Sequence, residues 1–393
     1  MEYMIFFKMD KKTKHFLTVV LLTVVCLVCQ RLWILIKVEE QTYILPSSNT
    51  ESIHKRNYTH EIHFHRKDTS PEKTGALQFL KNFKNPCWKE ATGHGKSMRI
   101  QCLPYFYIVG SPRCGTTDLN SRLIMHPSIS KRVSKENHWI ARKRFYRKGK
   151  SNTLSQYLRL FDRAVQTDIT TKQRNGYYYS IFGDSSCSNL WDNVVLLREW
   201  KKTGMTEKPY YTNANVIYNL THTAKIIMLL RNPVTRLYSD YLAFTRRRVN
   251  AADFHEKVVF SVDHYKYCLK KHDERYCAYY YPNTGVRLTI GLYIIYIEDY
   301  LRVFPRNQIK ILKTENYSEN ISSSLKDVFN FLEIGIPTES IMNSITGKGK
   351  INGNRRRQIE SGKMLPKTHT LLSNFYQPYN EKLVKLLGDR FIF

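Results

Sequence analysis

The stretch that decides the fold is Tyr107-Ile-Val-Gly-Ser-Pro-Arg-Cys-Gly-Thr-Thr117. An apolar run leads into a turn punctuated by Gly110 and Gly115, and a helical pattern begins at about Thr116. Backbone N–H groups and the helix dipole converge at such a turn, which makes it a cradle for an anion. The glycines have P-loop spacing, but Thr116 stands where an ATP-binding loop requires lysine. We therefore expect a loop that binds phosphate without the chemistry of an NTPase. The alternative is an ordinary strand–helix turn.

A second segment favours the phosphate interpretation. Lys225–Leu230 is a continuous apolar run, as expected of a buried parallel strand, and it ends at Arg231. An arginine at the carboxyl end of a strand points into the crevice where open α/β sheets bind ligands. Arg231 can fork onto a phosphate, and the Ser239 hydroxyl, about two helical turns further on, is a second donor. We expect Arg236 and Asp240 to form only a surface i,i+4 ion pair.

The rest of the pattern predicts an α/β fold, a P-loop-like parallel sheet flanked by helices on both faces. One further strand is predicted at Gln308–Lys313. Helices are predicted at Thr235–Thr245, Thr284–Val303, Leu325–Leu332 and from about Thr370 to Leu387. Residues 141–180 show no pattern that assigns them to either class.

The first residues predict a membrane anchor. Residues 16–36 are predominantly apolar and carry no charge apart from Arg31, and at about 1.5 Å per residue they just cross a hydrocarbon core of about 30 Å. Lysines precede this span and glutamates follow it, so the positive-inside rule keeps residues 1–15 in the cytosol. A cleaved signal peptide is the alternative. We expect a stem at 37–84 and one domain at 85–393.

A luminal location has chemical consequences. It permits N-glycosylation at the four sequons, which start at Asn57, Asn219, Asn316 and Asn320. It also permits disulfides, of which Cys268–Cys277 is the best candidate and Cys87–Cys102 a plausible second. Outside the predicted span no C-x-x-C occurs, so we expect no metal site.

The formal net charge of +29 points to a polyanionic partner. Nucleic acid is not expected, because the excess is spread along the chain and no nucleic-acid-binding motif is visible. An anchored luminal protein would meet an anionic polysaccharide instead.

At this point the motifs resemble a known family. The segment Gly110–Leu119 resembles the 5′-phosphosulfate loop of Golgi carbohydrate sulfotransferases, and Arg231–Tyr241 resembles their 3′-phosphate motif. The block that begins Lys135-Glu-Asn-His-Trp is similar to the segment that carries the catalytic carboxylate in the heparan-type branch. The C-terminal segment that begins at Met364 is similar to the closing segment of the same branch. Together they most resemble the N-acetylgalactosamine 4-sulfate 6-O-sulfotransferases, which act on chondroitin sulfate. The resemblance covers roughly residues 85 to 390.

The resemblance implies the sulfate donor 3′-phosphoadenosine 5′-phosphosulfate. Backbone N–H groups would bind its 5′-phosphosulfate, at Cys114, Gly115, Thr116 and Thr117. Arg231 and Ser239 would bind the 3′-phosphate, and the segment containing Lys348 and Lys350 would close over the nucleotide. Arg113 would stabilise charge on the bridging oxygen. The family usually has lysine there, and a guanidinium does not readily donate a proton, so its role as an acid is left open.

The resemblance also implies catalytic and acceptor residues. Glu136 would be the general base, with a pKa raised by sequestration. His138 is either its helper or a packed histidine, and Asp184 either an acid beside the acceptor or a turn former. Several basic residues lie at or shortly after this block: Lys135, Arg142, Lys143 and Arg144. This basic run either binds the acceptor or is only a solvated face.

Three functions compete at this stage. The first is a Golgi sulfotransferase acting on a chondroitin-type acceptor, with heparan-type or uronyl O-sulfation as a variant. The second is a kinase or NTPase, which the missing loop lysine disfavours. The third is a silent glycosaminoglycan-binding membrane protein, which would leave Arg231, Ser239 and Glu136 unexplained.

Overall fold

The computed structural model describes residues 78–91, 97–145, 153–201, 211–245, 249–280, 285–349 and 359–393. The chain divides into two compact units, Met1–Ile62 and His63–Phe393, and every described residue belongs to the second. The predicted tail, membrane span and most of the stem, with Asn57, lie outside the described residues. Within the described part of the chain, no helix has both the length and the apolar character needed to cross a bilayer.

Four parallel strands form the central sheet, in the order β6–β3–β7–β8. Their bounds are β3 Phe106–Gly110, β6 Gly183–Asp184, β7 Lys225–Leu230 and β8 Ile309–Lys313. All of β3 and all of β7 beyond Lys225 is buried, which is why both read as uninterrupted apolar runs. The predicted parallel sheet is confirmed. Strand β6 was not predicted, because two residues are too few to show a pattern.

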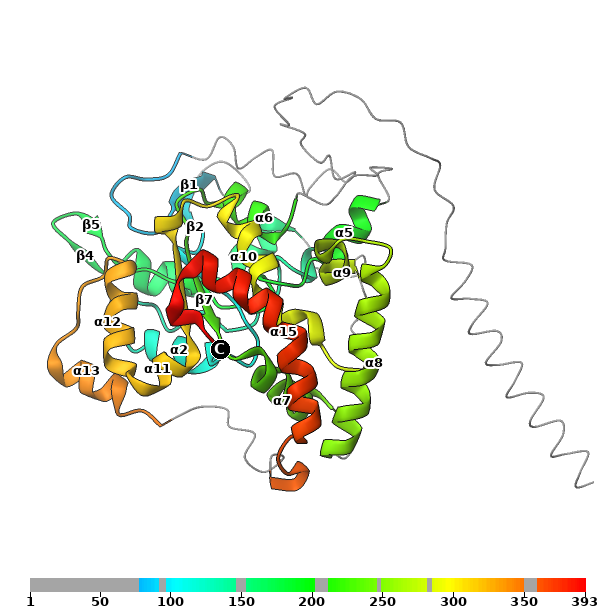
Figure 1. Ribbon diagram of the computed structural model, residues 1–393. Coiled ribbons are helices and arrows are strands. Elements are labelled where there is room, and N and C mark those ends of the chain that lie inside the picture. The colour runs from blue at the N-terminus through cyan, green and yellow to red at the C-terminus, as the bar shows by residue number, and fades with distance from the viewer. Residues whose placement is uncertain are drawn as a thin grey trace, which may run out of the picture. The chain divides into compact units, whose positions relative to one another are not determined.

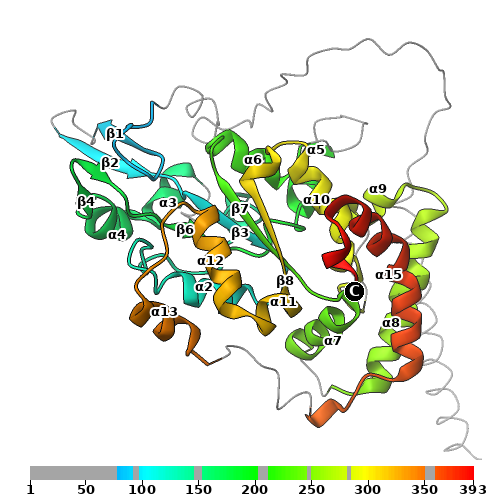
Figure 2. The ribbon, with the colours of Figure 1, turned by 60° about the vertical axis from the view of Figure 1, so that its left-hand side comes forward.

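Helices cover both faces of this sheet, as predicted. Figures 1 and 2 show α2, α12 and α13 on one side and α8, α10 and α15 on the other. The helices of the first side are α2 Thr116–Leu123, α11 Thr314–Glu319, α12 Ile321–Phe331 and α13 Glu339–Thr346. The other helices are α5 Val194–Lys201, α6 Asn213–Leu220, α7 Pro233–Phe244, α8 Ala251–Leu269, α9 Glu274–Tyr280, α10 Tyr293–Leu301 and α15 Pro366–Leu387.

The predicted helices agree with α7, α12 and α15 within a few residues, but the one at 284–303 is too long, because only α10 in its second half is an α-helix. That stretch contains a 3₁₀ turn, Leu288–Gly291, followed by the shorter α10. Gly291 lies against the ring of Tyr376, where an added Cβ would come within 2.7 Å. The chain therefore turns at a position that tertiary packing reserves for glycine. The 19-residue α8 was not predicted at all.

Residues 141–180 gave no prediction because their elements are short. They comprise a 3₁₀ turn at Lys143–Phe145, α3 Leu154–Arg159, α4 Asp162–Ala164, a π-turn at Val165–Ile169, and the hairpin of β4 Gln173–Arg174 with β5 Tyr177–Tyr178. None is long enough to show a helical or an alternating period.

Both proposed disulfides are present. Cys87 and Cys102 join β1 (Cys87–Ala91) to β2 (Met98–Cys102), where the two residues face each other in an antiparallel pair. Cys268 and Cys277 join the end of α8 to α9. Among the described cysteines, Cys114 is a buried thiol.

Residues just before the predicted domain boundary also pack on the domain. The ring of Phe83 stacks on Tyr178 with centroids 4.3 Å apart, and the backbone N–H of Lys84 donates to the Tyr178 carbonyl. Three sequon asparagines lie on the surface, where a glycan could attach: Asn219, Asn316 and Asn320.

The Cys87–Cys102 bridge closes a loop of 15 residues, for which chain entropy predicts about 3 kcal/mol of stabilisation. The variant Cys87→Ser/Cys102→Ser should lose about 3 kcal/mol of unfolding free energy, measured by urea denaturation of the domain under oxidising conditions. Reducing agent should destabilise the wild type by more than it destabilises the variant, which keeps only Cys268–Cys277. Equal sensitivity of the two proteins would show that the first bridge contributes nothing.

Candidate active site

The loop after β3 leaves backbone N–H groups available. Gly115, at φ 86°, is the N-cap of α2 and offers no side chain to cap it. In any α-helix the first N–H groups lack intrahelical acceptors, so those of Thr116 and Thr117 remain for a ligand. The N–H of Cys114 instead donates to the Ser111 carbonyl at 3.3 Å, within the loop itself. The predicted set of donors is therefore smaller by one in this conformation.

The two predicted phosphate motifs meet in space. Arg113, at φ 68°, donates from Nε to the Ser239 hydroxyl on α7 at 3.2 Å. Arg231, at the end of β7, donates from Nη1 to the Arg113 carbonyl at 3.5 Å. These segments lie more than a hundred residues apart in the chain, and the pairing of β3 with β7 brings them to one edge of the sheet. The edge thus carries two guanidiniums beside a helix N-terminus.

Several contacts hold this edge rigid. The Asn232 side chain caps α7 by accepting from the N–H groups of Val234 and Thr235. The backbone N–H of Asn232 donates to Glu315 Oε1 at 2.9 Å, and the Tyr293 hydroxyl donates to the Arg231 carbonyl at 2.8 Å. The backbone that carries Arg231 is therefore fixed before any ligand arrives.

The ion pair of Arg236 and Asp240 is present, but the prediction that it lies at the surface is wrong. Arg236 is 0% and Asp240 2% exposed, and Nη1 lies 3.7 Å from Oδ1. Asp240 also accepts a two-pronged contact from Arg287, with Nε at 2.7 Å from Oδ2. Sequence reasoning missed Arg287, which stands outside every recognisable motif. Its charge lies close enough to Arg113 and Cys187 to affect the pKa of both.

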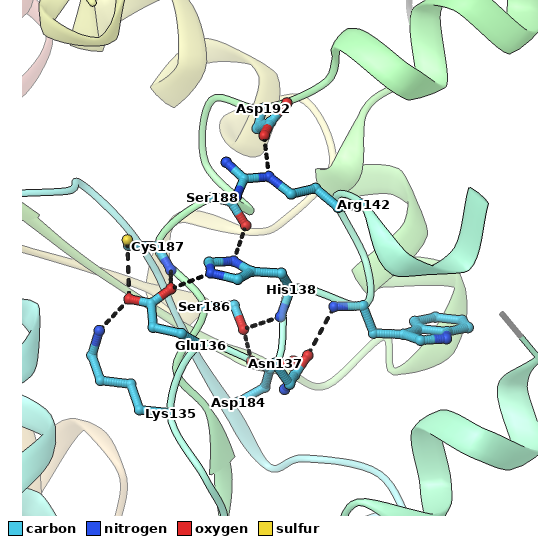
Figure 3. A network of polar contacts seen from close by, with 11 residues as sticks. Lys135, Glu136, Asn137, His138, Arg142, Asp184, Ser186, Cys187, Ser188 and Asp192 are labelled. Carbon is cyan, nitrogen blue, oxygen red and sulfur yellow. Dashed lines mark hydrogen bonds and ion pairs between the residues drawn. The ribbon is translucent and has the colours of Figure 1, made fainter. Parts of the chain in front are cut away.

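Glu136 is the centre of the polar network in Figure 3. One carboxylate oxygen contacts the Lys135 ammonium and accepts from the Cys187 thiol at 3.1 Å. The other lies 3.1 Å from His138 Nε2 and accepts from the Cys187 N–H at 3.3 Å. Glu136 and His138 both have positive φ, 64° and 54°, so the backbone turns back and brings their side chains together. This conformation is costly for residues with a side chain and is often found at functional sites.

The pKa of Glu136 differs from the prediction. Burial raises the pKa of the carboxyl, but Lys135, the Cys187 thiol and His138 outweigh burial, so the pKa lies below its ordinary value. The expected increase is therefore wrong for this conformation. Burial, together with Arg142 and Lys135, lowers the pKa of His138 despite the attraction of Glu136. A neutral His138 can donate from Nε2 to Glu136 while Nδ1, 2.7 Å from the Ser188 hydroxyl, accepts from it.

Asp184 lies beneath this network and not on its surface. It is fully buried, and it accepts from the hydroxyls of Tyr157 at 2.8 Å and Ser186 at 2.7 Å. The Ser186 hydroxyl in turn accepts from the His138 N–H at 3.1 Å. Burial raises the pKa of Asp184. The residue cannot touch a polysaccharide, so the acceptor role assigned from sequence is replaced by one in positioning His138.

The basic run after Glu136 splits into different environments. Arg142 keeps 36% of its side chain exposed while Nε donates to Asp192 Oδ2 at 2.5 Å. Arg144 donates to the Ile140 carbonyl at 2.6 Å, and burial lowers its pKa to about 10. Arg144 therefore faces inward, whereas Arg142 and the half-buried Lys143 stay accessible.

Of the two lysines expected over the nucleotide, Lys348 is tied to α2. Its ammonium donates to the Ser121 carbonyl at 3.3 Å, and its carbonyl accepts from the buried Arg122 at 2.6 Å. Lys350 lies outside the described residues. In the described part of the chain, no group of His, Cys, Asp or Glu is arranged to hold a metal ion.

Comparison with known proteins agrees with this geometry. Residues 103–370 match the family model described as sulfotransferase domain. The chain belongs to the sulfotransferase family. Human carbohydrate sulfotransferase 15 is 36% identical over 316 residues, which cover 76% of this chain and 56% of that protein. The protein of the same name from Nototodarus sloanii is 40% identical over 141 residues, 34% of this chain and 86% of that one.

A more distant similarity extends to the heparan branch. Mouse heparan sulfate glucosamine 3-O-sulfotransferase 3A1 is 24% identical over 303 residues, which cover 74% of this chain and 64% of that protein. The sulfotransferase-family resemblance drawn from the motifs is thereby confirmed. The chain spans about half the length of the vertebrate carbohydrate sulfotransferase 15 proteins it matches.

Proposed function

We propose that this sulfotransferase moves the sulfuryl group of 3′-phosphoadenosine 5′-phosphosulfate to a sugar hydroxyl of a glycosaminoglycan. The proposed acceptor is the 6-hydroxyl of N-acetylgalactosamine 4-sulfate in chondroitin sulfate. The observation that carries the proposal is the contact of Arg113 with Ser239, because it joins a 5′-phosphate cradle to a 3′-phosphate site at one sheet edge. An NTPase would need only the first of these.

The residues present fit this donor. The N–H groups of Thr116 and Thr117 at the α2 N-terminus suit the 5′-phosphosulfate. Arg231 and Ser239 suit the 3′-phosphate, since a guanidinium and a hydroxyl are both donors. Arg113 contacts Ser239 and carries its carbonyl against Arg231, so it links the two proposed phosphate sites. There it can stabilise charge on the leaving phosphate, which needs no proton transfer.

Glu136 is the proposed base for the acceptor hydroxyl. The hydroxyl oxygen attacks sulfur as its proton moves to the carboxylate, and the bond from sulfur to the bridging oxygen breaks. In the described conformation Lys135 and His138 keep the carboxylate ionised, and a base must begin the reaction in that form.

The acceptor assignment rests on charge and on the relatives. A formal net charge of +29 suits a polyanion, and the matched carbohydrate sulfotransferase 15 proteins are carbohydrate enzymes by name. We further propose anchoring through residues 16–36 with the domain in the Golgi lumen. The two disulfides and the exposed sequon asparagines are consistent with an oxidising, secretory compartment.

Transfer from ³⁵S-labelled donor to chondroitin 4-sulfate, desulfated chondroitin and heparan sulfate tests the proposal. We expect label on chondroitin 4-sulfate, and disaccharide analysis should find a 4,6-disulfated N-acetylgalactosamine. Label on heparan sulfate alone would show that the acceptor is that of the heparan-type branch. Tight polysaccharide binding without label on any acceptor would indicate a silent binding protein.

The variant Glu136→Gln should lose about 10²–10⁴-fold in transfer rate, because the amide keeps the shape of the side chain but cannot take a proton. Affinity for 3′-phosphoadenosine 5′-phosphate, measured by calorimetry, should stay close to that of the wild type. Single-turnover transfer within a few-fold of wild type would remove Glu136 from the mechanism.

The variant Lys135→Met should shift the acid limb of the pH profile of kcat/KM. In the wild type Lys135 holds the pKa of Glu136 below its ordinary value, so the base stays ionised into mildly acid solution. Without that charge the pKa rises, and activity should fall at a higher pH than in the wild type. Lys143→Met, a nearby lysine that is not part of the Glu136 network, is the control and should keep the wild-type profile. Superimposable acid limbs for all three proteins would contradict the assignment.

The variant Arg231→Ala should weaken binding of 3′-phosphoadenosine 5′-phosphate by about 10–100-fold, because it removes a charge-assisted phosphate contact. Adenosine 5′-phosphosulfate lacks the 3′-phosphate and should be nearly indifferent to the change. Calorimetric titration of both nucleotides measures this. An equal loss of affinity for the two would show that Arg231 does not read the 3′-phosphate.

A further inference from the structure

Trp191 lies beside two arginines from distant parts of the chain. The guanidinium of Arg142 is 5.9 Å and that of Arg287 5.8 Å from the centre of the Trp191 ring, within cation–π range. The indole Nε1 is buried, and no hydrogen-bond partner for it is found among the described residues. A half-buried tryptophan thus brings together two cations that the sequence separates by more than a hundred residues.

Carboxylates and rings fix both guanidiniums in place. Arg142 donates from Nε to Asp192, while Nε and Nη2 of Arg287 donate to Asp240. The guanidinium of Arg287 also lies 4.1 Å from the centre of the Phe244 ring, and Phe244 is 60% exposed. Each guanidinium has five N–H donors, so both keep donors that these contacts do not use.

The pair lies next to the reaction centre. Arg142 is close enough to His138 to lower its pKa, and Figure 3 shows it beside Ser188 and His138. Arg287 affects the pKa of Arg113 on the donor loop and of Cys187, which contacts Glu136. The two cations therefore lie near the proposed base.

Arg287 also lines a cavity of about 350 Å³. The other side chains of its lining include Tyr241, Phe244, Lys257 and Asp240, and the Asp240 carboxylate is paired with Arg287. That volume falls within the range of small-ligand sites, roughly 300–1,000 Å³. Aromatic rings with a few cations suit a sugar that carries an anionic group, because the rings pack on its C–H face and the cations pair with its charge.

We propose that Trp191, Arg142 and Arg287 form an acceptor subsite that binds an anionic group already present on the polysaccharide. The proposal rests on the proposed function, since it concerns the acceptor of that transfer. The unused N–H donors of the two guanidiniums pair with a sulfate or a carboxylate, and Trp191 sets their spacing. Asp192 and Asp240 orient the guanidiniums, so little conformational entropy is lost when the anion binds.

The sulfate and the carboxylate of the acceptor are distinguished with three polysaccharides: chondroitin 4-sulfate, its desulfated form and its carboxyl-reduced form. In Arg287→Gln, kcat/KM for the acceptor that keeps the recognised group should fall about 10–100-fold. The ratio of kcat/KM between that acceptor and the one lacking the group should shrink towards one. Arg142→Gln should shrink the same ratio, and Arg287→Lys should restore part of it. Arg302→Gln, which removes a half-exposed arginine paired with Asp299, is the control.

Two results would overturn the subsite. One is an equal loss of kcat/KM for all three acceptors in both glutamine variants. The other is a wild-type kcat/KM for all three acceptors in both variants. Affinity for 3′-phosphoadenosine 5′-phosphate, measured in parallel, shows whether a loss lies in donor binding instead. Equilibrium binding of the three polysaccharides to wild type and variants needs no turnover. It therefore tests the subsite even if the wild type transfers sulfate to none of them, a result that would sink the proposed function alone.

Discussion

The candidate site depends on the parallel pairing of β3 with β7. In register, Tyr107 lies opposite Ile226 and Ile108 opposite Ile227, so both strands run to the same edge of the sheet. The loop after one strand and the helix after the other then meet, and Arg113 reaches Ser239. The side chains of both strands are apolar and almost wholly buried, so a one-residue slip would misplace the strand ends and both phosphate motifs.

The same edge concentrates positive charge that is only partly neutralised. Arg113, Arg231 and Arg287 lie close together, and Asp240 serves as counter-ion to Arg287 and to the buried Arg236. An isolated cluster of this kind would repel itself in a half-buried setting. A phosphate-rich ligand supplies the missing negative charge, so binding and electrostatic relief coincide. This relief would add to the affinity for the proposed donor.

Glu136, the proposed base, is held by contacts to both of its carboxylate oxygens. Its backbone has positive φ and its carboxylate is engaged by Lys135, His138 and Cys187. Burial raises the pKa of the Cys187 thiol to about 12, so this group stays protonated and remains a donor. Beneath, the buried Asp184 fixes Ser186 and through it His138. The carboxylate is thus held in one position by groups from three parts of the chain.

The sequence by itself determined the parallel sheet, the phosphate motifs and both disulfides. Each is a local signal, an apolar run, a glycine spacing or a cysteine pair around a short loop, and local signals survive without neighbours. Tertiary structure decided what depends on distant residues. Packing of Gly291 against Tyr376 accompanies a 3₁₀ turn in the first part of the predicted 284–303 helix, so that α10 begins only at Tyr293. Burial turned Asp184 and Arg144 inward, and Lys135 lowered the pKa of Glu136. Arg287 joined the site only because folding placed it beside Asp240 and Trp191, and no pattern in one chain encodes such a meeting.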